Sequence, residues 1–417
     1  MRVAVIGAGV IGLTTAYALI RQGHEVDLIE RRDEVGLETS FANGGQLSYR
    51  YVSPLADAGV PLEALSWMLR SDAPLRFKPQ LNLHQWRWCL QFLAACRRSV
   101  NQRNTAHLLR LALHSQKVLH TWREQDLLDD FAWRSNGKLV VYRENSSWEK
   151  ARKTPEDANR RLLSSEQCLA IEPALAGIAN ELRGGVYAPG DEVGDCYHFC
   201  QQLLERLRSN PRFQLHANYD VKGLRVSNGS VQALQLNTGD EHQVDHLVIA
   251  AGVHSLRLLK PLGIDVPLYP LKGYSLSLQL DKDAPAAQPA VPETNVTDYD
   301  NKVVYARLDD QLRVAAMVDV GGWDSSLDSK RISQLRNLAA LSFPHAGNFA
   351  TATAWAGLRP ATPEGTPWLG ASNIKNLWLN LGHGSLGFTL ACGSADVLAQ
   401  LLDGSPAPIS LDGLSHH

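Results

Sequence analysis

The sequence lacks any uninterrupted apolar run approaching about 18 residues, so no membrane-spanning helix is expected. Its six cysteines are scattered over 417 residues, which argues against a disulfide framework and favours reduced thiols. Because the first predicted strand begins at Arg2, no signal peptide is expected, and a cytoplasmic location is favoured. A net charge of only −2 excludes a general attraction to nucleic acid.

Cysteine spacing also gives no indication of a metal site. Cys196 and Cys200 lie four residues apart on one face of a predicted helix, but no second pair with metal-ligand spacing lies nearby. We therefore expect both to be packing residues and expect no metal. An apolar content of 44% with 20% charged residues is ordinary for a globular enzyme, and 417 residues suffice for two lobes.

Residues 2–30 carry the most informative pattern, a glycine-rich turn between a strand and a helix. A predicted strand over 2–6 runs into the segment GAGVIG at 7–12, and the helix that follows ends at Gly23. A second strand over 25–29 ends at Glu30. In such a unit Gly7 makes the tight turn, Gly9 lets the backbone approach a pyrophosphate, and Gly12 lets helix and strand pack closely. The helix start offers N–H groups to phosphate oxygens, and Glu30 can accept hydrogen bonds from an adenosine ribose. The sequence thus predicts a Rossmann-type dinucleotide site.

The rest of the chain predicts a second lobe and a discontinuous nucleotide lobe. Residues 36–48 form a loop of small residues suited to a flat ligand, and residues 60–130 are predicted to be helical. A buried strand over 245–252 returns to the parallel sheet, whereas 262–320 alternates apolar and polar residues as an antiparallel sheet does. A second glycine-rich turn at 382–394 opens another helix. We expect an α/β fold with the nucleotide lobe in 1–50, 165–257 and 346–417 and an α+β substrate lobe in 51–164 and 258–345.

Several segments resemble the D-amino acid oxidase superfamily of flavoproteins, in particular bacterial D-amino acid dehydrogenases of the small-subunit type. They include LETSFANGGQLS (37–48), the run 53–75, GDEVGDC (190–196), YPLKGYSLSL (269–278), WAGLRPATPEGTPWLG (355–370) and NLWLNLGHGSLGFTLACGS (376–394). The resemblance covers nearly the whole chain and implies non-covalent FAD, a Rossmann-type FAD-binding lobe and a substrate lobe on an antiparallel sheet. Positions that match cofactor contacts of the family, with their neighbours, are Gly7, Ala8, Gly9, Val10, Ile11, Gly12, Glu30, Arg31, Ser40, Asn43, Gly44, Gly45, Gln46, Leu47, Val221, Ala250, Ala251, Gly252, Gly357, Arg359, Gly382, His383, Gly384, Ser385, Leu386 and Gly387.

The resemblance also implies candidate catalytic residues. Arg359 matches the arginine that family members place over the flavin to hold the substrate carboxylate, and its planar fork suits a bidentate contact. A phenol from Tyr274, Tyr305 or Tyr51 could add a hydrogen bond, although each tyrosine could equally be a core residue with a satisfied hydroxyl. His383 is either a neutral donor near the flavin or a packing residue of the tight turn. No dedicated base is required if the substrate amine loses its proton before hydride transfer.

The activity implied is oxidative deamination of a D-amino acid in bacterial amino acid catabolism, with hydride transfer from Cα to FAD and electrons passed to a quinone or another respiratory-chain acceptor. Departures from the family pattern at 48–51, at Ala315-Ala316 and at Tyr305 also suit a cyclic substrate, D-proline or cis-4-hydroxy-D-proline, which would give a pyrroline carboxylate. A non-catalytic FAD-binding subunit of a multi-subunit oxidase and an oxidase that uses O2 are the rivals.

The segment from Trp67 to Arg98 mixes tryptophans with arginines. It fits either a peripheral contact with the inner face of the cell membrane or an amphipathic helix whose aromatic residues pack inward. The sequence leaves open whether the protein forms homo- or hetero-oligomers.

Overall fold

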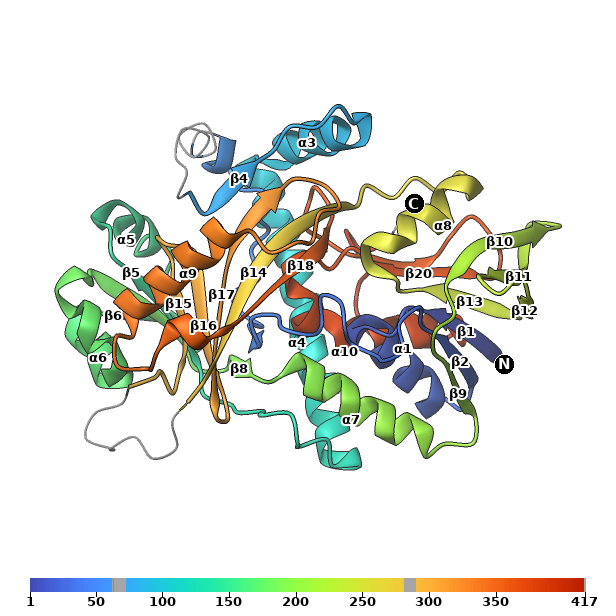
Figure 1. Cartoon of the computed structure of the whole chain (residues 1–417), viewed down its shortest axis with the longest axis horizontal. Coiled ribbons are helices and arrows are strands. Elements are labelled where there is room, and N and C mark those ends of the chain that lie inside the picture. Colours follow the sequence, from blue (N-terminus) through green and yellow to red (C-terminus); the bar gives the residue numbers. More distant parts are fainter. Residues whose placement is uncertain (62, 64–72, 281–289, 416–417) are drawn as a thin grey trace.

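The computed structural model describes residues 1–61, 63, 73–280 and 290–415, and the chain forms two lobes around two large sheets (Figure 1). The first sheet has six strands in the order β19-β20-β13-β1-β2-β9. Its neighbours pair in parallel except β19 and β20, which are antiparallel. The strands are β1 (Arg2–Ile6), β2 (Glu25–Ile29), β9 (Phe213–His216), β13 (His246–Ile249), β19 (Trp368–Ala371) and β20 (Leu377–Leu381). The two strands predicted around the glycine-rich turn are confirmed with the predicted bounds.

Helices cover one face of this sheet. They are α1 (Val10–Arg21), α7 (Cys196–Arg208) and α10 (Gly387–Leu402), and the long α4 (Arg98–Asp126) packs against α10. Gly23 follows the end of α1 with a φ of +86°, a conformation that favours glycine over residues with a Cβ. Asp195 caps α7, because its Oδ1 accepts hydrogen bonds from the N–H groups of Tyr197 and His198. The apolar faces of these helices form the largest buried cluster of the molecule.

A small antiparallel sheet covers the other face of the six-stranded sheet. It consists of β10 (Val221–Ser227), β11 (Ser230–Leu236) and β12 (Glu241–Gln243), and the short α8 (Ser255–Leu259) lies beside it. Val221 and Ile249 belong to one buried cluster between the two sheets. The six-stranded sheet is therefore covered on both faces, as a parallel sheet requires.

The second large sheet has the order β18-β14-β17-β16-β15-β5-β7-β6, and β4 pairs with β17. Its strands are β4 (Leu75–Phe77), β5 (Lys138–Tyr142), β6 (Arg161–Leu163), β7 (Gly184–Ala188), β14 (Tyr269–Gln279), β15 (Asn295–Asp298), β16 (Val303–Leu308), β17 (Gln311–Val320) and β18 (Thr353–Ala361). The other helices and strands of the described residues are β3 (Gln46–Leu47), α3 (Leu83–Ala95), α5 (Asn145–Ala151), α6 (Ser165–Ile171), β8 (Glu192–Val193), α9 (Ser329–Ser342) and short 3-10 turns at 173–181, 252–254, 260–262, 349–351 and 384–386.

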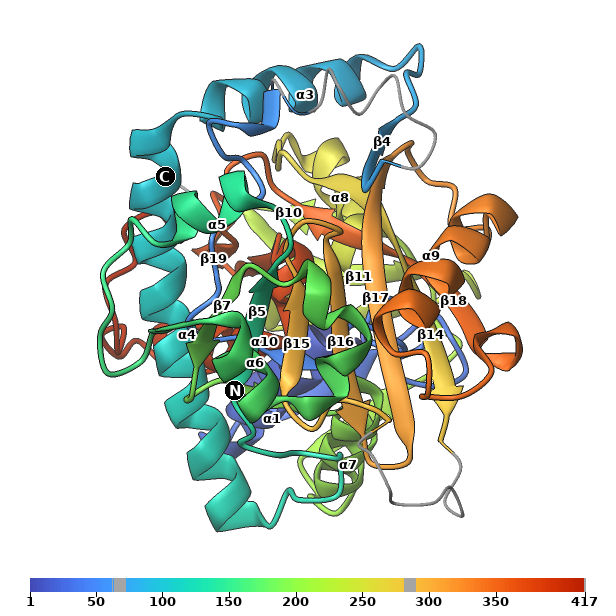
Figure 2. The same cartoon turned by 90° about the vertical axis from the view of Figure 1, so that its left-hand side faces the viewer.

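The two faces of this sheet have different neighbours, and this decides which side chains can reach a ligand. Helix α9 packs against β14 and β17 and covers one face of the sheet (Figure 2). The loop that leads into β3 lies on the other face, where Ser275 Oγ donates to the Ala42 carbonyl at 2.6 Å. A Cβ at Gly44 would lie 3.1 Å from Val304 Cγ2 and 3.7 Å from Ala315 Cβ. Because side chains alternate along a strand, Tyr274 and Tyr305 point to the α9 face.

The structure differs from the sequence prediction at several boundaries. Strand β4 interrupts the segment 60–130 that was predicted to be helical, and Trp67 and Arg70 lie outside the described residues. β7 and β18 belong to the large antiparallel sheet although their residues were assigned to the nucleotide lobe. α4 was assigned to the substrate lobe but packs against α10 of the nucleotide lobe. These boundaries depend on pairing between segments far apart in the sequence, which local patterns do not reveal.

Within the described residues, one helical segment, Gly384–Leu402, is long and apolar enough by composition to cross a membrane. In this fold it lies between α1 and α4. Thr14 Oγ1 donates to the Ala391 carbonyl at 3.2 Å, and a Cβ at Gly393 would lie 2.8 Å from the backbone of Ser115. Such close packing on two sides identifies it as a core helix.

Candidate active site

The glycine-rich turn between β1 and α1 has no room for side chains at two of its three glycines. Gly7 has a φ of +99°, and a Cβ there would lie 2.8 Å from Ala251 Cα at the end of β13. A Cβ at Gly12 would lie 1.7 Å from the Gly7 carbonyl oxygen. At Gly9 a Cβ would meet only Ser40 Oγ, at 3.3 Å, so the space above this residue is open for a ligand.

Helix α1 begins at this turn without a side-chain cap and with no acidic residue in its first turn. Val10 N–H donates to Ser40 Oγ at 2.9 Å. The other N–H groups of a first helical turn have no partner within the helix, and together they favour a bound anion. This is the geometry that a pyrophosphate requires.

Glu30 lies at the carboxyl end of β2, directly beside the turn. It is buried, its Oε2 accepts a hydrogen bond from Ala8 N–H at 2.7 Å, and its Oε1 accepts one from Arg32 N–H at 2.9 Å. A carboxylate has about four lone-pair directions, so two remain for a ribose diol. The neighbouring Arg31 forms an ion pair with Glu38 and lies 2.9 Å from His254 Nε2. Glu30 therefore fits the ribose role, while Arg31 orders the chain that follows it.

The predicted flavin loop bridges the two lobes. Thr39 Oγ1 donates to the Leu358 carbonyl on β18 at 2.7 Å, next to Arg359. Asn43 Oδ1 accepts from Gly45 N–H at 3.0 Å, and the Asn43 carbonyl accepts from Arg313 Nη1 at 2.8 Å. Gln46 Nε2 donates to the carbonyls of Val296 and Tyr305. The loop is thus fixed to the strands that a substrate would face.

The second glycine-rich turn places an uncapped helix end at the same site. α10 has no side-chain cap and no acid in its first turn, and Gly382 and Gly384 have φ values of +84° and +54°. His383 is 2% exposed, its Nε2 lies 2.9 Å from Ser394 Oγ, and burial lowers its pKa to about 3. It is therefore neutral. The hydrogen bond to Ser394 supports the packing alternative for its side chain.

The remaining predicted cofactor residues lie around these elements. Ala250 and Ala251 approach Gly7, whereas Gly252 has no atom within 4 Å of its would-be Cβ. The Val221 carbonyl accepts from Arg257 Nη2 at 3.2 Å. The side chain of Leu47 is buried in the helical core, so only its backbone can face a ligand. The open glycines, the two uncapped helix ends and Glu30 fit an FAD molecule bound from α1 to the large sheet.

Arg359 lies on β18, on the face of the large sheet that the loop covers. Its guanidinium extends over Gly273, where a Cβ would lie 2.2 Å from Nη2, and Nη1 donates to the Met317 carbonyl at 3.0 Å. The side chain is partly exposed, and among the described residues no carboxylate lies within ion-pair distance of it. Burial lowers its pKa to about 10, an effect that nearby Asp319 opposes. Within the described part of the chain, Arg359 is therefore a cation that no carboxylate contacts.

Two of the three candidate tyrosines do not face this arginine, so these assignments are wrong. Tyr274 is 1% exposed and donates to Asp319 Oδ2 at 2.8 Å, on the α9 side. Tyr305 is also 1% exposed, donates to Ser342 Oγ of α9 at 3.0 Å and packs edge-on against Phe343. Both are core residues with satisfied hydroxyls, the alternative considered for each.

Tyr51 remains a candidate, and it brings in Lys138, which the sequence analysis missed. The side chain of Tyr51 keeps 41% of its surface exposed, although the surrounding protein raises the pKa of its hydroxyl. Lys138 Nζ lies 4.6 Å from the centre of its ring and donates to Gln46 Oε1 at 2.7 Å and Ser48 Oγ at 2.8 Å. In the sequence, Lys138 stands at the start of the apolar strand KLVVY, where a lysine is usually exposed to solvent. No sequence pattern therefore distinguished it from the lysines of the surface.

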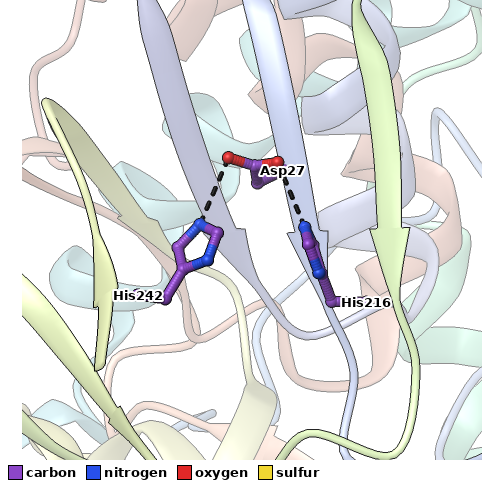
Figure 3. Close-up of side chains that lie close together, drawn as sticks. All are labelled: Asp27, His216 and His242. Atoms are coloured by element: carbon purple, nitrogen blue, oxygen red, sulfur yellow. Dashed lines mark hydrogen bonds and ion pairs between the residues drawn. The ribbon is translucent and has the colours of Figure 1, made fainter. Parts of the chain in front are cut away.

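A separate cluster of side chains with metal-ligand chemistry lies at the edge of the six-stranded sheet. Figure 3 shows His216 and His242 pointing a ring nitrogen at Asp27, at 3.1 and 3.2 Å from its two carboxylate oxygens. Arg2 Nε donates to the same carboxylate at 2.6 Å. These partners, led by His216, lower the Asp27 pKa far below its usual range despite burial, which opposes the shift. Because Arg2 already neutralises Asp27, the contacts describe a hydrogen-bonded charge network.

Comparison with known proteins matches this geometry. A family model described as FAD dependent oxidoreductase (DAO) matches residues 2–401. "D-amino acid dehydrogenase 2" of Pseudomonas aeruginosa is 52% identical over 415 residues, covering 99% of this chain and 97% of that protein. "D-amino acid dehydrogenase 2" of Ralstonia nicotianae is 43% identical and covers 96% of each. Among solved structures, glycine oxidase from Bacillus cereus superposes with a TM-score of 0.73 at 20% identity, covering 100% of this chain and 98% of that one, which indicates the same fold.

Proposed function

This chain belongs to the family of FAD dependent oxidoreductases, and on that basis we propose that it is a dehydrogenase that oxidises a D-amino acid. The names of its relatives from Pseudomonas aeruginosa and Ralstonia nicotianae support the substrate class. The product would be an imino acid, which hydrolyses to a 2-oxo acid and ammonia.

The observation that carries the proposal is the guanidinium of Arg359, which contacts no carboxylate of the residues that the structure describes. A carboxylate bound to its two nitrogens would form charge-assisted hydrogen bonds of the strong, bidentate kind. Met317 holds one nitrogen through its carbonyl, and Gly273 leaves the space in which the guanidinium lies. The arginine is thereby held in a fixed orientation before the substrate arrives, which lowers the entropic cost of orienting the substrate.

FAD, when bound, accepts the hydride from the substrate Cα. The protein positions the substrate: Arg359 takes the carboxylate, and the Tyr51 hydroxyl is the phenol left to contact the rest of the molecule. The Tyr51 pKa is raised by burial, so the hydroxyl stays protonated and acts as a hydrogen-bond donor. The amine can lose its proton to water before transfer, so no side chain is assigned as base.

The direct test is anaerobic reduction of the flavin in the purified protein by a panel of D-amino acids, with the L-enantiomers as controls. We expect loss of the oxidised flavin absorbance with D-enantiomers only. Reduction by no member of the panel would contradict the proposal and would favour a non-catalytic FAD-binding subunit. Peroxide formation at the rate of substrate oxidation would identify an oxidase instead. The panel includes D-proline and cis-4-hydroxy-D-proline, because the sequence also suited a cyclic substrate. Of the tyrosines considered as contacts for such a substrate, only Tyr51 remains a candidate.

We further propose that electrons pass to a quinone or another respiratory acceptor at a membrane surface, and that α3 makes the contact. Leu83, Trp86, Leu90 and Leu93 are 87%, 46%, 67% and 50% exposed, and their spacing places them on one face of α3. The opposite face is anchored, because Trp88 Nε1 donates to the Ala361 carbonyl at 3.0 Å, two residues from Arg359. Arg87, Arg97 and Arg98 are exposed on or next to the same helix. An exposed apolar row with adjacent arginines is typical of helices that lie in an anionic lipid surface.

Co-sedimentation with vesicles that contain anionic lipid tests this contact. We expect Leu90→Gln combined with Leu93→Gln to lower binding, because apolar area available for burial in the lipid is lost. The matched control is Leu341→Gln, which changes a leucine of α9 that is 67% exposed elsewhere on the protein. Equal binding of both variants and the wild type would exclude α3 as the contact.

A further inference from the structure

Lys138 is a buried cation that no acidic side chain of the described residues contacts. Four lysine or arginine side chains are buried in the described chain: Lys138, Lys272, Arg313 and Arg331. The last three have a carboxylate within 3.2 Å, from Asp324, Asp195 and Asp319. No carboxylate of the described residues lies within ion-pair distance of Lys138 Nζ. Buried charges are normally paired, so Lys138 stands out from the other three.

The ammonium group is held in a fixed position. Nζ donates to Gln46 Oε1 and Ser48 Oγ, and it lies over the ring of Tyr51. An ammonium has three donors, so one remains. Burial lowers the Lys138 pKa to about 8, with nearby Asp191 opposing the shift, so the group is mainly charged at neutral pH. Asp191 is mainly ionised at neutral pH, since burial raises its pKa only to about 6, but it does not contact Lys138: its Oδ1 accepts from Arg50 N–H and its Oδ2 has no hydrogen-bond partner.

Lys138 and Arg359 lie on the same face of the large sheet. Paired residues on neighbouring strands point to the same face, and Lys138 pairs with Asn295. Thr297 lies two residues after Asn295 and therefore shares its face; Thr297 pairs with Val304, and Val304 pairs with Ala315. Ala315 pairs with Ser275, whose face also carries Gly273 and Arg359. The Arg359 guanidinium reaches from β18 across β14 to the Met317 carbonyl on β17. From the other side of the sheet, the Lys138 ammonium reaches from β5 to Gln46, whose amide contacts the carbonyls of Val296 on β15 and Tyr305 on β16, so the two side chains extend towards each other. Tyr51, partly exposed, lies on this face beside Lys138.

We propose that Lys138 binds a second carboxylate on the substrate, so that the preferred substrates are D-amino acids with an acidic side chain. This rests on the proposed function. With a monocarboxylate substrate and a neutral amine, one of the two cations would have no anion in contact with it. With a dicarboxylate, each of the two cations would contact one carboxylate. The substrate is therefore defined by its two carboxylates. The length of the preferred substrate's side chain reports the distance between the Lys138 ammonium and the Arg359 guanidinium.

The test compares kcat/KM for D-aspartate, D-glutamate and D-2-aminoadipate with that for D-glutamine and D-norvaline. We expect one of the acidic substrates to be preferred. Replacing Lys138 by Gln, which keeps a donor for its neighbours but removes the charge, should lower kcat/KM for that substrate by about 100-fold and for D-norvaline by less than about threefold. Lys272→Met is the matched control, since it removes a buried lysine of the same sheet that lies on the α9 face; it should leave the preference unchanged.

Binding of unreactive acids gives a second reading that does not depend on turnover. Glutarate should perturb the absorbance of the bound flavin at lower concentration than butyrate, and Lys138→Gln or Lys138→Met should remove that difference. If wild-type enzyme oxidises neutral D-amino acids as well as acidic ones, or if Lys138→Gln weakens all substrates equally, the proposal is overturned while the dehydrogenase function stands. If no D-amino acid reduces the flavin, the proposed function itself fails.

Discussion

Replacing Arg359 by Lys tests whether the unpaired guanidinium is the carboxylate receptor. The arginine offers a planar pair of donors, whereas a lysine offers a point charge that can satisfy only one carboxylate oxygen at a time. The loss is therefore one charge-assisted hydrogen bond, worth about 1.5–3 kcal/mol, or about 10- to 150-fold in kcat/KM. In this structure the lysine would also compete for the Met317 carbonyl, which now fixes one nitrogen. We expect a loss of more than about tenfold.

The assay is stopped-flow reduction of the flavin under anaerobic conditions, with kcat/KM read from its dependence on substrate concentration. FAD content measured on the same preparation shows whether the variant still holds its cofactor. Arg307→Lys is the matched control: Arg307 lies on β16 of the same sheet but pairs with Glu293 at the surface. We expect a change below about twofold there, as for surface ion pairs generally. An unchanged kcat/KM in Arg359→Lys would remove this residue from the site.

Three further results follow from the geometry. Gly12→Ala should yield protein with little FAD, seen as a low ratio of flavin to protein absorbance, because the added Cβ would lie 1.7 Å from the Gly7 carbonyl oxygen; a normal ratio would contradict this account of the turn. Asp27→Asn should lower the free energy of unfolding in urea by about 3 kcal/mol, since an amide replaces a buried carboxylate that faces three donors, and no loss would mean that the network contributes nothing. Asp191→Asn should gain stability over wild type as the pH rises from 4 to 8. Burial raises the pKa of Asp191 in the folded protein to about 6, whereas its pKa in the unfolded chain is about 4. The free energy of unfolding of the wild type therefore falls by about 2–3 kcal/mol as the pH rises from 4 through 6, and that of the variant does not. Parallel pH profiles of the two proteins would refute this.

The nucleotide turn could be predicted from the sequence because its determinants are local. A short apolar strand, three glycines at fixed spacing and an acid at the next strand end specify β1, α1 and β2 without reference to the rest of the chain. Lobe boundaries could not be predicted in this way. β18 pairs with β14 some eighty residues earlier in the chain, and β7 pairs with β5 across two short helices, so membership of a sheet is decided by contacts that no local window contains.

The tyrosines show a different limit. The alternation of apolar and polar residues along β14 and β16 was visible in the sequence. It correctly places Tyr274 and Ser275 on opposite faces of the sheet, and likewise Tyr305 and Val304. What the pattern does not contain is which face α9 covers and which face the loop covers. That information depends on packing of a helix more than twenty residues away. Lys138 was missed for a related reason, because burial of a strand end is set by the loop and the Gln46 side chain that cover it.

The two parts of the site are built by different means. Backbone geometry makes most of the nucleotide site, through glycines and free N–H groups, so it tolerates few substitutions and carries little information about the substrate. In the site proposed here, side chains on one face of the large sheet would bind the substrate: Arg359, Tyr51 and Lys138. The loop at 39–48 connects them, since Ser40 contacts the start of α1 and Gln46 contacts Lys138. A family member can therefore change its substrate by altering this face while leaving the cofactor turn intact, and the residues that distinguish this chain should be sought on β5, β15 and β16.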